Sequence, residues 1–70
     1  MSEWELEQLR RELRRLRETL RTIVWLAREA ADALDEAYEG LNDKDYEWAT
    51  KHLQRAEMCV WRILKVAGGW

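Results

Sequence analysis

Two side chains in this sequence could do chemistry on their own, the single histidine His52 and the single cysteine Cys59. On a helix their seven-residue spacing sets them two turns, or ~10 Å, apart, too far to share a metal ion or to act as base and nucleophile. One cysteine cannot close a disulfide within the chain, and no second ligand sits beside His52. We therefore expect no enzyme, no cofactor and no metal site. His52 should be a rim residue bonded to solvent, and Cys59 a small, semi-buried apolar residue.

Charged side chains gather in two parts of the sequence. Eight acidic residues lie between positions 29 and 47, but without the spacing of a calcium-binding loop, and such a run on a helix is typical of a solvated face. Six arginines lie between positions 10 and 21 and could contact phosphates, although glutamates in the same segment nearly neutralise them. Because the net charge is only −2, nucleic acid is the third of the functions we consider and an anionic membrane is not expected as a partner.

The length of the chain limits what it can do alone. Seventy residues make one small domain, and the lone core of such a domain is marginal without disulfides, a metal or association. The longest fully apolar stretch, 23–27, is far too short to span a membrane, and Met1–Glu5 does not resemble a signal peptide. We expect a soluble protein, cytoplasmic if natural or expressed recombinantly, that gains stability by associating.

Apolar residues recur through the first part of the chain at alternating steps of three and four, the heptad pattern of a helix that packs along one stripe. The stripe consists of Leu6, Leu9, Leu13, Leu16, Leu20, Ile23, Ala27, Ala30, Leu34, Ala37 and Leu41. With Leu6 at heptad position a and Leu9 at d, it predicts a helix over about 3–39. Gly40 is expected to end this helix in the left-handed C′ conformation.

The same steps return after a short break and predict a second helix over about 43–67. Its stripe consists of Tyr46, Ala49, Leu53, Ala56, Val60, Ile63 and Ala67. Asn42 is expected to be the N-cap, with Asp45 at N3 and with Leu41 and Tyr46 as a hydrophobic staple. The turn at 40–42 is so short that the helices must lie antiparallel, and alanines facing alanines suggest a close approach near it.

The end of the chain is expected to form a tail over 68–70. Gly68 and Gly69 should stop the second helix, and Trp70 is either an addition for measuring absorbance or a natural terminus. The sequence thus predicts an all-α single domain over 1–70, a two-helix antiparallel hairpin with a long first helix.

The two predicted helices differ in length, and this difference suggests a self-association seam. Folding the second helix back from the turn brings its end opposite about Leu16, which leaves Leu6, Leu9 and Leu13 without a partner in the same chain. A helical segment of that length is marginal in water, so the unbroken seam favours packing on a second copy. The seam consists of Leu6, Leu9, Leu13, Leu16, Leu20 and Ile23. We expect a homodimer associating into a four-helix bundle or coiled coil, with a higher oligomer as the alternative.

Charges beside the seam bear on the direction of the second chain. Glu5 and Glu12 fall at heptad position g, and Arg10 and Arg17 fall at e. In a parallel dimer these make the attractive pairs Glu5 with Arg10 and Glu12 with Arg17, whereas an antiparallel dimer sets like charges together. This rule favours parallel chains, but exposed pairs are weak and the same charges can serve their own helix, so the antiparallel arrangement stays open.

Several tryptophans fall away from the predicted seam. Trp25 lies opposite it on the first helix, Trp48 and Trp61 lie off it on the second, and Leu64 extends the patch around Trp61. Aromatic side chains are enriched at binding hot spots, so this candidate face could bind a heterologous protein. The alternative is that helix rotation buries Trp25 and Trp61 inside a bundle.

The complete pattern resembles two kinds of protein. A short helical hairpin with a tight acidic turn over 41–45 resembles the Rop family of plasmid RNA-binding proteins, which are homodimeric four-helix bundles, although the long first helix departs from its equal helices and no RNA-contacting residue can be matched. The faultless heptads, the lack of proline and the tail at 68–70 resemble computationally designed helical hairpins more closely, although five tryptophans and a free cysteine are unusual in such designs. Both resemblances imply a non-enzymatic self-association module, and the alternative function is binding to a partner protein.

Overall fold

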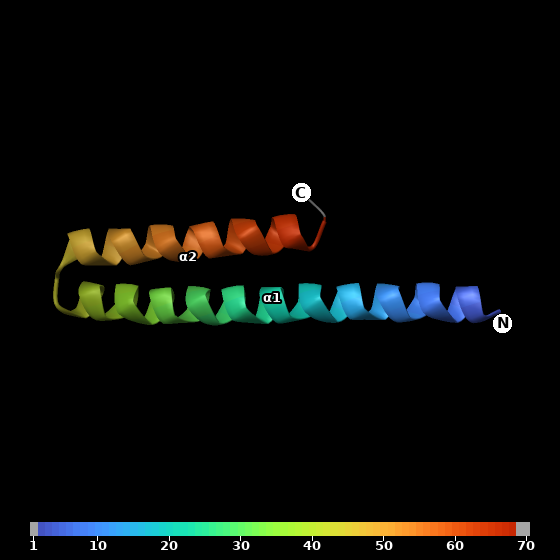
Figure 1. The fold of residues 1–70 in the computed structure, drawn as a ribbon. Coiled ribbons are helices and arrows are strands. Elements are labelled where there is room, and N and C mark those ends of the chain that lie inside the picture. Colours follow the sequence, from blue (N-terminus) through green and yellow to red (C-terminus); the bar gives the residue numbers. More distant parts are fainter. Residues whose placement is uncertain (1, 69–70) are drawn as a thin grey trace.

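The computed structural model describes residues 2–68 and shows an all-helical hairpin (Figure 1). Helix α1 spans Glu3–Asn42, which is 40 residues, and α2 spans Tyr46–Val66, which is 21 residues. The helices lie side by side and antiparallel, and α2 covers only the part of α1 nearest the turn (Figure 1). The molecule is therefore a rod of 63 × 19 × 10 Å. The predicted fold class, an antiparallel hairpin with a long first helix, is confirmed.

Helix α1 begins directly after Ser2, which is its N-cap. The Ser2 hydroxyl accepts a hydrogen bond from the backbone N–H of Glu5 at 3.2 Å, which satisfies one of the free donors of the first turn. Glu3 and Glu5 place negative charge at the positive end of the helix dipole. These interactions fix the start of α1 close to the predicted residue.

The turn lies three residues later than predicted. Helix α1 continues through Gly40 and ends at Asn42, and Lys44 takes the left-handed conformation with a φ of 57°. Asn42 is therefore not the N-cap of α2. That role belongs to Asp45, whose carboxylate accepts from the Trp48 backbone N–H at 3.1 Å.

The hydrophobic staple predicted across the turn is also wrong, because both of its members remain exposed. Leu41 is 51% exposed and Tyr46 is 63% exposed. At the other end, α2 stops at Val66, and Gly68 follows with a φ of 77°, as a helix-ending glycine should. The predicted roles of Gly69 and Trp70 lie outside the described residues.

Gly40 is required by the approach of the two helices. A Cβ atom at Gly40 would lie 2.9 Å from the backbone nitrogen of Ala49 and 3.1 Å from the carbonyl oxygen of Asp45. Both atoms belong to the backbone at the start of α2, so neither can move aside without shifting that helix. The predicted close approach near the turn is confirmed, and glycine is the residue that permits it.

The line of contact between the two helices includes only part of the two predicted apolar stripes. The buried residues of α1 are Leu26, Ala30, Ala33, Ala37 and Gly40, and those of α2 are Ala49, His52, Ala56 and Cys59. These buried residues occupy heptad positions d and g, whereas the predicted stripes occupy positions a and d. Each helix is therefore rotated, so that its a row, including Leu34 and Leu53, stays exposed.

This contact line consists almost entirely of small side chains. No large side chain among the described residues is fully buried, and Leu26 is the largest apolar residue in the core. Small residues let helices approach closely but bury little apolar area, which is the main source of stability. The hairpin core is thus thin compared with the apolar surface that the chain carries.

Replacing Gly40 by alanine tests the close approach. In an exposed helix interior the change would stabilise by about 1 kcal/mol. Here the added Cβ meets backbone, and overpacking of this kind typically costs about 1–3 kcal/mol. We expect Gly40→Ala to lower the free energy of unfolding in a urea titration. The matched control Thr50→Ala, on the exposed surface of α2, should not destabilise. Equal stability of the two variants would contradict the contact.

Candidate self-association surface

Among residues 2–68, the first half of α1 has no partner. Residues 3–22, which we call the arm, are exposed throughout except for Thr19, and the first buried residue of α1 is Leu26. Figure 1 shows the arm as the blue and cyan part of α1 that projects beyond the end of α2. The unpartnered segment is thus longer than predicted, since Leu16 and Leu20 belong to it as well.

The predicted seam residues line the arm as an exposed leucine stripe. Leu6, Leu9, Leu13, Leu16 and Leu20 are between 42% and 55% exposed. Ile23, at the border with the covered half of α1, is half-buried. One exposed leucine is ordinary, but five along one stripe form a contiguous patch of the kind that marks an interaction site.

A second apolar surface lies on the hairpin itself, and we call it the open face. It comprises Val24, Leu34, Tyr38, Leu41, Tyr46, Leu53 and Val60, which are between 46% and 66% exposed. Heptad position a lies about 90° around the helix from the midline between d and g, because each residue turns the helix by about 100°. When each helix is viewed from its own N-terminus, position a lies on the same side of this midline in both helices. Since the helices are antiparallel, both a rows therefore turn toward one side of the hairpin.

The accessible surface of the chain is larger than that of a compact protein of the same mass. The accessible surface is 6249 Å². A compact monomer of 8.5 kDa is expected to expose about 4,700 Å². The excess of about 1,600 Å² is close to the area that a standard protein interface buries in total.

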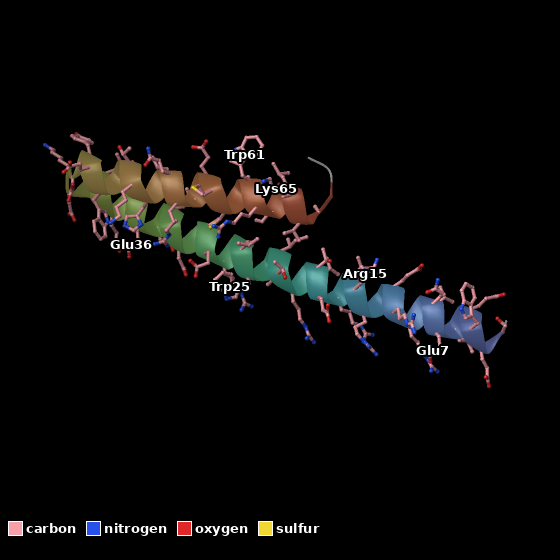
Figure 2. All side chains as sticks on the ribbon, turned by 45° about the horizontal axis from the view of Figure 1, so that its top comes forward. Glu7, Arg15, Trp25, Glu36, Trp61 and Lys65 are labelled. Atoms are coloured by element: carbon pink, nitrogen blue, oxygen red, sulfur yellow. The ribbon has the colours of Figure 1, made fainter. Side chains whose placement is uncertain are left out.

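The four residues of the candidate partner face do not come together in one patch. Trp25 and Trp61 are 62% and 56% exposed, and they point away from each other on the outer sides of the two helices (Figure 2). Trp48, 42% exposed, lies at the turn end of α2, where its ring is 4.4 Å from that of His52. Leu64 is half-buried. Trp25 does have apolar neighbours, since it shares a shallow depression with Leu20 and Val24.

The charges expected to orient a partner are exposed, and one of them is engaged within its own helix. Arg10 forms an ion pair with Glu7 of its own helix at 3.5 Å, at a spacing of three residues. Glu5, Glu12 and Arg17 are exposed. Four arginines gather beside the leucine stripe, where they line one depression with Leu13 and Glu18: Arg10, Arg14, Arg17 and Arg21. The arm is therefore apolar along its stripe and basic beside it.

His52 is not the rim residue that the sequence suggested. It is only 7% exposed and lies on the contact line, where its Nδ1 accepts from the guanidinium of Arg55 at 3.3 Å. Its Nε2 is buried and has no hydrogen-bond partner among the described residues. Cys59 is a buried free thiol on the same line. His52 and Cys59 lie two helical turns apart on this line.

Comparisons with known proteins assign no family to this chain. Neither protein-family models, nor curated proteins, nor solved structures gave a match to the chain. Within residues 2–68, no helix is long and apolar enough to cross a membrane. The same residues contain no group of three or more His, Cys, Asp or Glu side chains placed to hold a metal ion.

Replacing His52 by leucine tests whether its orphan nitrogen weakens the core. A buried polar group without a partner costs about 1–3 kcal/mol, and leucine of similar size removes that group. We expect His52→Leu to raise the free energy of unfolding by about 1 kcal/mol in a urea titration. His52→Gln, which keeps a polar group at the site, is the matched control and should give no gain. A loss of stability in His52→Leu would show that the histidine is satisfied as it stands.

Proposed function

We propose that this chain is a non-enzymatic helical self-association module, with further copies of itself covering the arm and the open face. One observation carries the proposal. Apart from Leu26, the large apolar side chains of both helices lie outside the buried core, and most of the exposed ones fall in two rows, the leucine stripe and the open face. Folding the hairpin leaves about half of each of these side chains in water, and burying the exposed half of a leucine is worth roughly 0.8–1.5 kcal/mol. Association is thus the source of stability that the small core lacks.

The proposal fits both kinds of protein that the sequence resembles. Computationally designed helical hairpins and Rop-like dimers both place apolar stripes on the outer side of a hairpin, where a second hairpin buries them. A designed origin would account for the regular heptads and the lack of proline. A Rop-like role in binding RNA would use the arginines of the arm as phosphate contacts.

Dilution tests self-association directly. If only the folded, associated form is stable, a hundredfold dilution removes about 2.7 kcal/mol of apparent stability from a dimer. For a dimer of this size, the melting midpoint followed by circular dichroism should fall by roughly 5–10 °C. Sedimentation equilibrium should give a mass above 8.5 kDa in the concentrated sample. A monomer mass with a constant midpoint would refute the proposal.

Truncating a leucine of the arm tests which surface associates. Leu13 is 55% exposed in the single chain, so Leu13→Ala should hardly alter the hairpin. If a second copy buries Leu13, the truncation costs about 2–5 kcal/mol at each site and raises the dissociation constant at least ~30-fold. Glu18→Ala, on the same arm and off the stripe, is the matched control for sedimentation. Equal dissociation constants for the two variants would show that the arm stays solvated.

A second candidate function is binding of a partner protein through Trp25. The tryptophan is 62% exposed and lies beside Leu20 and Val24, and tryptophan is among the residues most enriched at hot spots. The dilution experiment separates the two functions. A stable monomer would favour partner binding, whereas a concentration-dependent oligomer favours self-association.

A further inference from the structure

We propose that two copies of this chain dock antiparallel, with the arm of each lying in the groove between α1 and α2 on the open face of the other. The arrangement rests on the proposed self-association and specifies which surfaces meet and in which direction the chains run. It differs from both the parallel dimer that the flanking charges favoured and the four-helix bundle of Rop-like proteins.

The relative lengths of α1 and α2 support a full antiparallel overlap of two copies. Helix α2 has 21 residues and covers the second half of α1, so twice its length nearly equals the 40 residues of α1. Two α1 helices that overlap antiparallel along their whole length set each arm beside the covered half of the other. The two α2 helices then lie end to end in one groove. Every cross-section of this dimer contains three helices, and no part of either α1 lacks a neighbour.

The apolar surfaces fit this arrangement. A helix in a three-helix bundle faces the groove between its two neighbours with one stripe, and the arm offers its leucines at heptad positions a and d. The groove that receives them is lined by the open face, where Leu34 of α1 and Leu53 and Val60 of α2 lie exposed. Removing the excess surface from both copies would bury about 3,200 Å², within the range of permanent homodimers.

The net charges of the two halves of α1 favour the antiparallel direction. Residues 10–21 contain six arginines and two glutamates, a net charge of +4. Residues 28–39 contain five acidic residues and Arg28, a net charge of −4. Antiparallel docking brings these segments together to within about one helical turn. Parallel docking sets +4 beside +4 and −4 beside −4, and segments of like net charge repel each other. This preference acts between whole segments, since Asp32, Asp35, Glu36 and Glu39 line a depression with His52 and Arg55 and not with residues of the open face.

The flanking pairs that favoured parallel chains weigh less than this asymmetry. They involve Glu5 with Arg10 and Glu12 with Arg17, all exposed, and exposed pairs contribute little to stability. Arg10 is already paired with Glu7 of its own helix. The basic flank of Arg10, Arg14, Arg17 and Arg21 lies on the e and b side of the stripe. In the antiparallel dimer that side meets the b row of the partner's α1, which carries both Asp35 and Arg28, so the flank itself adds little to the preference.

Distances between nitroxide labels test the direction. Cys59 is first replaced by alanine, and single cysteines for labelling are introduced as Gln8→Cys on the arm and Thr50→Cys near the turn, both on the surface. At ~1.5 Å per residue, antiparallel docking separates the two labels at residue 8 by about 45 Å, and those at residue 50 by about 50 Å. Parallel docking brings each label within roughly 10–25 Å of its copy, since packed helices lie 8–10 Å apart.

A mixture of the two singly labelled chains gives the positive signal. In the antiparallel dimer, residue 8 of one chain lies beside residue 50 of the other, so half of the dimers should show a separation of roughly 10–25 Å. Long separations in the separate samples together with this short one in the mixture support the arrangement. Short separations at residue 8 alone would overturn it and leave self-association intact. Absent dipolar coupling with a monomer mass would overturn self-association as well.

Discussion

The contact between α1 and α2 through alanine and glycine determines where every other apolar side chain lies. Gly40 lets the backbone at the start of α2 come so close that a single added carbon would meet it at 2.9 Å. A contact this close holds only small residues, and the larger ones are turned to the outer side of the hairpin. The close packing of the two helices, the thin core and the wide exposed stripe all follow from the small residues on the contact line. The surface available for association follows from the way the hairpin closes.

Heptad spacing was sufficient to predict the two helices, their direction and the unpartnered leucines at the N-terminal end. It could not show which row turns inward, because positions d, a and g are all apolar or small in the second half of α1. The size of the residues contained that signal, since Ala33, Gly40 and Ala37 allow an approach that Leu34 and Leu41 forbid. Periodicity reports the width of a stripe, and packing against a neighbour selects the part of it that is buried.

The position of the turn shows why local sequence rules were insufficient. Gly40 has the identity of a helix-ending residue, and Asn42 and Asp45 are both good N-caps, so the sequence offers two turns three residues apart. The tertiary contact of Gly40 with Ala49 fits only the later one. In a hairpin, each residue by which the turn moves shifts the end of the second helix by two along the first. A shift of three therefore lengthened the unpartnered segment from about 13 residues to the 20 of the arm. His52 was missed for a related reason, since its burial depends on which row turns inward.

The unequal cover along α1 also means that one continuous helix contains two regions of different local stability. Backbone hydrogen bonds of the half beside α2 open only when the hairpin opens, whereas an isolated helix of about 20 residues is close to balance between helix and coil in water. Amide hydrogens should therefore exchange fastest near Glu3 and progressively more slowly toward Ala33. Because α1 contains no proline and its only glycine is Gly40, ordering contributed by a contact on the arm can extend into the hairpin without a break. If a second copy docks on the arm as proposed, docking and helix formation there form a single equilibrium, in which each strengthens the other.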